Sequence, residues 1–423
     1  MRDIRIGSAD LFPTDHPLDP AQMIGRAEDV DRVAAALLGG GNVVLAGARR
    51  TGKTTVADAT LRACAADGAY VAAVDLFGLT DATEFAQALT VALLANRPAL
   101  RRAFGEAGSV RDVLGALRRA AAVRARQDLG DGVEVVFEIA GSVAEAGSHE
   151  RLRAALELGE RLADRDGRRV VIFLDEFQEV VGADKRFGPP EQVTRLLRAI
   201  LQRSPHVSVL FAGSIEHLMR DLFSPSDRAL SQFGAFHELA TITTQQWREG
   251  LRSRLADDAT TISDDALERV IALGEGHPRM TMLLIQQAHA GSVEELRREI
   301  DHALVVQALE RAMRQERLRH DQQLELIRTL GRNAERMAIR VAAGAELYAG
   351  LKPQQAARAL SALEDRGIVS RSGRKGDWFV IDPLLRRYLA ARRVEPLSFV
   401  RAVHDSVTVR DAVSATVTRK PEA

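Results

Sequence analysis

Residues 47–54, GARRTGKT, have the types and spacing needed to hold the phosphates of a nucleotide. They fit the pattern G-x-x-x-x-G-K-[ST] at every fixed position. Gly47 and Gly52 allow a loop to wrap so that backbone N–H groups face the phosphates. Lys53 would reach the β- and γ-phosphates and serve catalysis, and the Thr54 hydroxyl would ligate Mg²⁺. The pattern therefore predicts an ATP and Mg²⁺ site.

The neighbouring residues complete this predicted phosphate cradle. Ala48, Arg49, Arg50 and Thr51 would supply N–H groups of the loop, and Thr55 follows in the same run. The helix that comes next adds the positive end of its dipole. An ordinary Gly-rich turn could share this composition, but here the loop joins an apolar strand to a helix, as phosphate binding requires.

A second motif lies at residues 170–176, VVIFLDE, where an apolar run ends in two carboxylates. Asp175 falls at the carboxyl end of a predicted strand, where open α/β sheets bind their ligands. We expect Asp175 to hold Mg²⁺ directly or through water, and Glu176 to polarise the attacking water. The same pair would also suit a strand end that meets a helix N-terminus. The sequence has no Cys cluster or His-Glu-x-x-His run that would favour zinc chemistry.

Apolar runs and helical periodicity alternate through the first part of the chain, which is typical of a parallel sheet covered on both faces. Buried strands are predicted at residues 42–46, 70–76, 169–174, 207–212 and 236–242. Helices are predicted at residues 21–40, 53–66, 81–128 and 150–166, and residues 129–149 are a Gly-rich break that holds the apolar run 133–139. The pattern indicates an α/β fold.

Bulk composition narrows the class of protein. Apolar residues make up 46% and charged residues 27%, as in a globular protein with a core. The net charge is zero, so binding to nucleic acid or membrane would need a local patch. The single cysteine, Cys64, excludes an internal disulfide framework and fits a reducing cytoplasm. No apolar window approaches the roughly 18 residues of a membrane span, so we expect a cytoplasmic protein.

Six runs occur in an order that resembles a known group of ATPases. The chain is similar to the prokaryotic AAA+/STAND-related ATPases, the "archaeal ATPase" group, and more distantly to the replication-origin initiator ATPases. The resemblance covers about residues 24–387. It depends on IGRAEDV at 24–30, GARRTGKTT at 47–55, YVAAVDLFGL at 70–79, VVIFLDEFQEV at 170–180, LFAGSIEHLMRDLF at 210–223 and GEGHPRM at 274–280.

The resemblance implies further nucleotide contacts. Gly25 and Arg26 match a Gly-Arg before a helix that flanks the adenine, although a simple helix start would read the same way. Ser214 falls where the group has a polar sensor near the γ-phosphate, and a Gly-Ser pair is also a common turn. Pro278 and Arg279 resemble the start of a lid helix with a second sensor arginine, for which a solvated helix-start arginine is the alternative.

One departure from the group concerns turnover. Where the group usually reads like Pro-Leu-Tyr-Gly-Arg, residues 229–235 are ALSQFGA, and the nearby Arg228 is shifted in position. An arginine finger can contribute orders of magnitude to the rate. We therefore expect slow intrinsic hydrolysis, or an arginine supplied by another subunit or a partner.

The C-terminal region resembles a winged helix. Residues 353–366 read as a helix, 368–371 and 378–381 as two strands, and Asp382 opens a last helix. Residues 351–393 hold ten Lys and Arg against four Asp and Glu, a local charge of +6 that could neutralise DNA phosphates. Arg371, Arg374 and Lys375 on the ribbon and its tip are the expected nucleic-acid contacts. A winged helix used only for packing or protein contacts is the alternative.

The expected fold is therefore a P-loop NTPase sheet with helices on both faces, followed by a helical lid and a C-terminal winged-helix domain. The strand signal stops at about residue 243, residues 245–302 read as a helical bundle, and 303–320 as one charged connector helix. The predicted domains are an N-terminal arm at 1–20, a P-loop ATPase domain at 21–242, lid and connector at 243–320, the winged helix at 321–393 and a weakly ordered tail at 394–423.

Three functions compete. The first is an ATP-driven switch that couples ATP binding and hydrolysis to duplex DNA through the winged helix. The second is a regulator with little turnover that recruits a protein partner and does not bind DNA. The third, a small-molecule kinase, is disfavoured because the Asp175–Glu176 pair suits water activation. Guanine specificity is not indicated, since the sequence has no Asn-Lys-x-Asp run.

Overall fold

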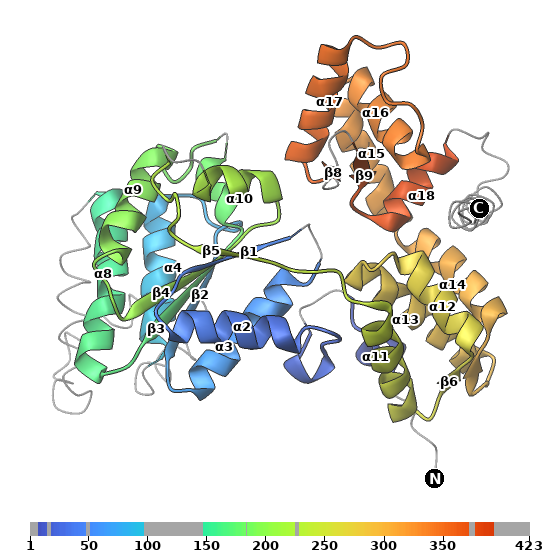
Figure 1. Ribbon diagram of the computed structural model, residues 1–423, viewed down its shortest axis with the longest axis horizontal. Coiled ribbons are helices and arrows are strands. Elements are labelled where there is room, and N and C mark those ends of the chain that lie inside the picture. Colours follow the sequence, from blue (N-terminus) through green and yellow to red (C-terminus); the bar gives the residue numbers. More distant parts are fainter. Residues whose placement is uncertain are drawn as a thin grey trace, which may run out of the picture. The chain divides into compact units, whose positions relative to one another are not determined.

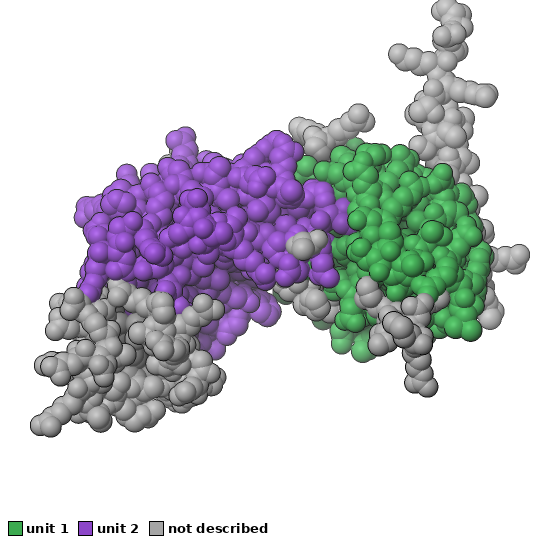
Figure 2. All heavy atoms as spheres, turned by 90° about the horizontal axis from the view of Figure 1, so that it is seen from below, with its two compact units in different colours: residues 1–18, 48–52, 240–423 green, residues 19–47, 53–239 purple. Residues whose placement is uncertain are grey.

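The computed structural model describes residues 7–14, 18–47, 51–96, 147–182, 184–224, 228–371 and 377–392. The chain forms two compact units, coloured separately in Figure 2. Residues 19–47 and 53–239 are called here the sheet unit, and residues 1–18, 48–52 and 240–423 the helical unit. Among the described residues, no helix is long and apolar enough to cross a membrane.

The sheet unit contains a five-stranded sheet in the order β2-β3-β4-β1-β5, with every neighbouring pair parallel. The predicted parallel sheet is therefore confirmed. The last strand is shorter than predicted, because it pairs only with β1 and that ladder ends where Glu238 lies opposite Ala46. The strands are β1 (Val43–Ala46), β2 (Tyr70–Asp75), β3 (Val170–Asp175), β4 (Val207–Ala212) and β5 (Ala235–Glu238).

Helices cover both faces of this sheet, as Figure 1 shows. Side chains of a strand alternate between faces, so β3 sends Val171 and Phe173 one way and Val170 and Ile172 the other. The first pair packs in a core with α2 (Ala27–Leu38) and α3 (Lys53–Ala66). The second pair packs in a core with α4 (Ala82–Leu94), α8 (Ser148–Asp166) and α9 (Pro190–Leu201). Because both faces are covered there, β1, β3 and β4 are apolar and buried along nearly their whole length. The prediction that the last strand is buried is wrong, because β5 lies at the edge of the sheet and most of its residues are exposed.

The helix boundaries of the sheet unit follow local rules. Asp81 caps α4 by accepting bonds from the N–H groups of Thr83 and Glu84, α8 ends at Gly167 with φ of 61°, and α9 has Pro190 in its first turn. Residues 97–146, which hold the rest of the predicted helical stretch and the run 133–139, lie outside the described residues. The helices are α2 (Ala27–Leu38), α3 (Lys53–Ala66), α4 (Ala82–Leu94), α8 (Ser148–Asp166), α9 (Pro190–Leu201) and α10 (Glu216–Phe223), with short 3₁₀ turns η1 (Pro20–Gln22) and η2 (Phe177–Val181).

The helical unit begins with the predicted bundle. Its first helix, α11 (Thr244–Asp257), has a capping box between Thr243 and Gln246. Two corrections arise here. A parallel ribbon of two-residue strands, β6 (Thr261–Ile262) and β7 (Glu299–Ile300), lies within the bundle. Strands of two residues are too short to show the alternation of apolar and polar residues by which a strand is predicted. The further helices are α12 (Asp264–Gly274), α13 (Pro278–Glu294) and α14 (His302–Gln315).

The second correction concerns the connector, which is two helices and not one. α14 ends at Gln315 and α15 (Arg317–Thr329) follows, so the break falls at Glu316. Glu316 is buried, and its carboxylate accepts hydrogen bonds from Arg279 and Arg319. The break therefore coincides with a buried charge cluster that periodicity alone does not reveal.

The last part of the chain has the predicted order of helices and ribbon. β8 (Val369–Arg371) and β9 (Trp378–Val380) are antiparallel, and the helices are α16 (Arg332–Ala343), α17 (Pro353–Asp365) and α18 (Pro383–Ala391). Their apolar faces meet through buried residues such as Leu360, Leu363 and Leu389. Residues 372–376 at the turn and 393–423 lie outside the described residues. Assignment of this part as a winged helix stays a prediction.

The N-terminal segment, expected to be an arm, is anchored where it is described. A short helix, α1 (Ser8–Leu11), packs against α13, and Phe12 is fully buried. Gln286 donates a hydrogen bond to the Phe12 carbonyl at 2.7 Å. Ser8 Oγ lies 2.8 Å from His289 Nδ1. The sequence did not predict these contacts, because contacts made by single side chains leave no periodic pattern.

Candidate functional site

The sheet order explains how the two sequence motifs meet. β1, β4 and β3 are neighbours and parallel, so their carboxyl ends lie along one edge of the sheet. The loop 47–52 follows β1, Asp175 ends β3, and Ser214 follows β4. The chain crosses over between β1 and its neighbours, and such crossovers place ligands at the strand ends. The fold thus brings together residues that are far apart in sequence.

Lys53 begins α3 and lies inside the sheet unit. Its side chain is buried, with 7% of the residue exposed, and Nζ donates a hydrogen bond of 2.8 Å to the carbonyl oxygen of Gly47. A buried ammonium group needs acceptors to offset the loss of hydration, and this carbonyl is one of them. The bond holds the lysine against the start of the loop, at the amino end of the helix.

The rest of the predicted cradle is described only in part. Gly52 has φ of 93°, a conformation that L side chains rarely adopt, which explains a glycine before the lysine. Thr51 and Thr55 are partly exposed. Ala48, Arg49 and Arg50 lie outside the described residues, so their predicted phosphate contacts stay predictions.

The Thr54 hydroxyl and the Asp175 carboxylate contact each other. Thr54 Oγ1 donates to Asp175 Oδ2 at 3.0 Å, and the other carboxylate oxygen accepts from the N–H of Glu176 at 2.9 Å. Burial raises the pKa of the Asp175 carboxyl above its ordinary value, and the nearby Glu176 adds to this, while the two hydrogen bonds oppose it. A hydroxyl and a partly buried carboxylate side by side are the oxygen donors that Mg²⁺ prefers. The donor set therefore fits the predicted ion.

This raised pKa leads to a prediction about Asp175. A carboxyl whose folded pKa lies above its unfolded value binds its proton more tightly when folded, so stability falls as pH rises through that window. Near pH 7 the cost of the ionised form is fully present. We expect Asp175→Asn to raise the melting temperature without nucleotide, at roughly 2–4 °C per kcal/mol recovered. The same change should abolish the extra stabilisation by Mg²⁺ and ATP, measured by thermal unfolding.

The exposed Asp67 on the same unit provides the control for this prediction, because Asp67→Asn should change neither quantity. A lower melting temperature for Asp175→Asn, together with undiminished stabilisation by Mg²⁺ and ATP, would contradict both the burial cost and the predicted ligand role.

Glu176 is held by two neighbouring polar side chains. Its Oε2 accepts a 2.7 Å hydrogen bond from Ser214 Oγ and another from Gln178 Nε2. Its backbone has φ of 50°, an uncommon conformation for a residue with a side chain. The carboxylate is therefore oriented by its neighbours at the strand edge. A carboxylate fixed by two donors is suited to accept a proton from water once substrate orders the site.

Gln178 is the site residue that sequence reasoning missed. It is 3% exposed, and its Oε1 accepts from the Ser214 N–H at 3.2 Å while its Nε2 reaches Glu176. A Cβ at Gly213 would collide with the Gln178 side chain and with Met219, so only glycine fits there. The run Asp-Glu-Phe-Gln contained the signal, because a polar residue two positions after Glu176 can turn back toward it.

Gly25 and Arg26 start α2, as the sequence predicts for a helix start. Gly25 has φ of 66°, and the Arg26 side chain is buried and pairs with Asp29 at 3.1 Å. Asp29 also lies 2.7 Å from His237 Nε2 on β5. This arrangement fixes the start of α2 against the sheet. The predicted adenine contact of Gly25 and Arg26 stays a prediction.

Pro278 and Arg279 start α13 in the helical unit. Pro278 stands in the first turn after the N-cap His277, as predicted for a lid helix. Arg279 is engaged with Glu316 at 2.8 Å. Burial alone would raise the pKa of Glu316, but the bonds and charges of Arg279 and Arg319 outweigh it and lower the pKa. Arg279 is thus held by a buried carboxylate, and its predicted role at the phosphates stays a prediction.

The predicted nucleic-acid residues are described only in part. Arg371 on β8 lies over the Trp378 ring at 4.9 Å and pairs with Glu364 at 3.2 Å. Arg374 and Lys375 lie outside the described residues. Several other basic residues of this region are also paired, namely Arg386 and Arg387 with Glu275 and Arg392 with Asp321. The local charge of +6 is therefore partly neutralised by acids from outside residues 351–393.

Comparison with known proteins agrees with this geometry. A walker-type ATPase of Pyrococcus abyssi is similar in fold, with a TM-score of 0.61 and 14% identity over 90% of this chain and 99% of that one. The ORC2 protein of Aeropyrum pernix, in ADPNP–ADP complexes, is similar with a TM-score of 0.52 and 16% identity over 95% and 98% of the two chains. At such identities the likeness concerns the fold.

Among curated protein sequences, none is significantly similar to this chain. Residues 22–211 match the family described as AAA ATPase domain, a segment that includes the loop 47–54, Asp175 and Glu176. This segment is therefore similar to AAA ATPase domains, and the fold of the chain is similar to the folds of these two solved proteins.

Proposed function

We propose that this protein binds and hydrolyses ATP with Mg²⁺ and acts as a nucleotide-dependent switch. The contact between Thr54 and Asp175 at 3.0 Å is the observation that carries the proposal. It joins the helix after the glycine loop to the acidic end of β3, as a metal–phosphate site requires. The AAA ATPase match over residues 22–211 supports nucleotide binding independently.

Each residue has a definite task in this proposal. Lys53 leaves the Gly47 carbonyl to bind the β- and γ-phosphates. Thr54 and Asp175 hold Mg²⁺, which neutralises charge on the phosphates when bound. Glu176 accepts a proton from the attacking water, and Ser214 positions Glu176 and senses the γ-phosphate. The group's usual arginine is absent from residues 229–235, so intrinsic turnover is slow.

The switch would reach the C-terminal helices through ion pairs of the helical unit. Arg279 at the start of α13 pairs with Glu316, which also binds Arg319, and Arg319 pairs with Asp382 at 2.8 Å. Asp382 caps α18 by accepting from two backbone N–H groups. If phosphate draws Arg279 away from Glu316, the partners of Glu316 must rearrange. The chain of contacts supports coupling between nucleotide and the C-terminal region.

We further propose that the C-terminal region is a winged helix that binds duplex DNA, with Arg371, Arg374 and Lys375 at the backbone. The helix–ribbon–helix order and the excess of basic residues support this proposal. A regulator that recruits a protein partner is the second candidate. It is favoured by the ion pairs of Arg371, Arg386 and Arg387, because their acidic partners neutralise part of the positive charge that DNA binding would use.

DNA binding gives a prediction with a clear salt signature. Replacing Arg374 and Lys375 with Ala should weaken duplex binding and reduce the slope of log K against log salt by roughly 2, about 0.9 for each lost phosphate contact. Fluorescence anisotropy with a labelled duplex at several salt concentrations measures both. Arg62→Ala with Arg195→Ala, which removes two exposed charges of the sheet unit, is the matched control. No binding of the wild type at low salt would favour the protein-partner candidate.

The decisive test of the main proposal is phosphate release by the purified protein, with Mg²⁺, with and without duplex DNA. ATP-dependent release that DNA accelerates supports the switch. Release that DNA does not change supports the ATPase and moves the partner to another class of molecule. Neither binding nor hydrolysis of ATP in the presence of Mg²⁺ would refute the proposal.

A further inference from the structure

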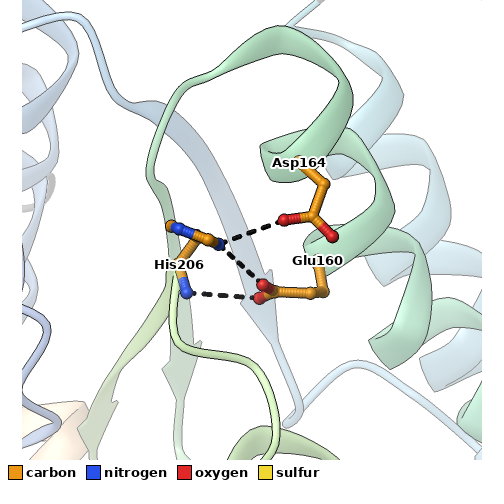
Figure 3. A group of neighbouring side chains, drawn as sticks. All are labelled: Glu160, Asp164 and His206. Atoms are coloured by element: carbon orange, nitrogen blue, oxygen red, sulfur yellow. Dashed lines mark hydrogen bonds and ion pairs between the residues drawn. The ribbon is translucent and has the colours of Figure 1, made fainter.

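A group of three side chains lies at the other end of β4 from Ser214. Glu160 and Asp164 stand four residues apart on α8, and His206 comes directly before β4. Figure 3 shows the two carboxylates and the imidazole ring turned toward one another. Among the described residues, this is the group of three His and acidic side chains whose donor atoms all lie within 4.8 Å of one another.

The contacts of this group converge on a single ring nitrogen. His206 Nδ1 lies 2.8 Å from Glu160 Oε1 and 3.2 Å from Asp164 Oδ1. A ring nitrogen carries one proton or one lone pair, so one linear hydrogen bond satisfies it. A second carboxylate at the same atom is not needed to satisfy the ring. It adds a second negative charge to the cluster, and a bound cation would offset the repulsion between the two carboxylates.

The spacing of the three side chains is close to that of metal ligands, although it is also that of hydrogen bonds. Ligands at about 2.0–2.2 Å from a tetrahedral metal lie about 3.3–3.6 Å apart. The observed 2.8 and 3.2 Å are both shorter than that spacing, so the side chains would have to move apart by less than about 1 Å to admit an ion. Glu160 Oε2 also accepts from the backbone N–H of His206 at 3.3 Å, which orients the carboxylate toward the ring.

We propose that Glu160, Asp164 and His206 form a surface site for a divalent first-row transition metal such as Zn²⁺. One imidazole nitrogen with two carboxylate oxygens suits these metals, whereas Mg²⁺ and Ca²⁺ prefer oxygen ligands alone. His206 and Asp164 have 50% and 61% of their side chains exposed, so water completes the coordination shell. The ion joins the C-terminal half of α8 to the segment before β4. It lies away from the proposed nucleotide site and does not depend on that proposal.

The chain offers a matched control for the imidazole. His302 is similarly exposed and pairs with a single carboxylate, Asp265, at 2.7 Å. A pair of this kind has one ligand fewer than the proposed site. His302→Ala should therefore leave Zn²⁺ binding unchanged, while His206→Ala should remove it.

The test is titration of Zn²⁺ into the full-length protein by calorimetry, without nucleotide. The wild type and His302→Ala should share one binding event that weakens at least about tenfold in His206→Ala and in Asp164→Asn, since loss of a mere supporting partner already costs about 10–100-fold. Zn²⁺ should also raise the melting temperature of the wild type and not of these two variants. Nuclear magnetic resonance of the histidine ring nitrogens should show the His206 signal shifting with Zn²⁺ in the wild type.

Two results would overturn the site. One is wild-type protein that binds no Zn²⁺, as expected if a proton on Nδ1 bridges the two carboxylates. The other is binding that His206→Ala and Asp164→Asn leave unchanged, which would place the ion elsewhere. Asp164→Asn changes a largely exposed side chain, so it keeps the test decisive even if His206→Ala disturbs the fold.

Discussion

Replacing Lys53 with Ala should reduce ATP affinity on the order of a hundredfold or more, to the point where binding is no longer measurable. Hydrogen bonds to charged groups contribute about 1.5–3 kcal/mol each, and 1.4 kcal/mol corresponds to tenfold in affinity. The lysine would make such bonds to two phosphates and also holds the Gly47 carbonyl at 2.8 Å. Titration with a fluorescent ATP analogue, or calorimetry, measures the loss.

Lys185→Ala is the control for this result, because Lys185 is an exposed lysine of the same unit. It should bind ATP as the wild type does. Circular dichroism of Lys53→Ala should be unchanged, since removing a buried ammonium relieves a desolvation cost. Unchanged affinity of a folded Lys53→Ala variant would mean that ATP binds elsewhere or not at all.

Glu176→Gln should retain ATP while phosphate release falls by about 10²–10⁴-fold, the usual contribution of a general base. Glutamine has nearly the shape of glutamate and can still accept the hydrogen bond from Ser214. It cannot accept a proton from water at neutral pH. The measurement pairs an ATP titration with a coupled assay for phosphate under the same conditions.

The same change at Glu191, an exposed residue of α9, controls for loss of one negative charge. Glu191→Gln should turn over ATP at the wild-type rate. If Glu176→Gln kept full turnover with Mg²⁺ present, Glu176 would have no part in proton transfer, and its contacts with Ser214 and Gln178 would be structural only.

The elements whose residues carry a local pattern, such as an apolar run or a glycine loop before a helix, could be predicted from the sequence. The buried strands at residues 170–175 and 207–212 are nearly all apolar, and the helix after Lys53 follows a glycine loop, so each carries its own signal. The parallel sheet followed from their alternation. The meeting of Thr54 with Asp175 also followed, because strands of a parallel sheet end at one edge.

What could not be predicted depends on single contacts between distant residues. The bond between Arg279 and Glu316 spans 37 residues, and that between Arg386 and Glu275 spans 111. A charge at one position gives no indication of its partner in a sequence with 58 basic and 58 acidic residues. For this reason the ion pairs of Arg371, Arg386 and Arg387 could not be expected from the sequence, and neither could the contact of Gln178 with Glu176. The short β6–β7 ribbon escaped because two residues show no alternation.

The salt bridges from α18 have a consequence for any shortened form of the protein. Asp382 holds Arg319, and Arg386 and Arg387 hold Glu275, although Arg387 itself is almost fully buried. Cutting the chain near residue 320, at the end of the predicted lid and connector, would leave Glu275 and Arg319 without these partners. Glu275 is partly exposed, so losing these partners costs less than the roughly 3–5 kcal/mol of a fully buried pair, but several ion pairs are lost at once. Since residues 240–423 belong to one compact unit, we expect the helices on the two sides of residue 320 to melt together.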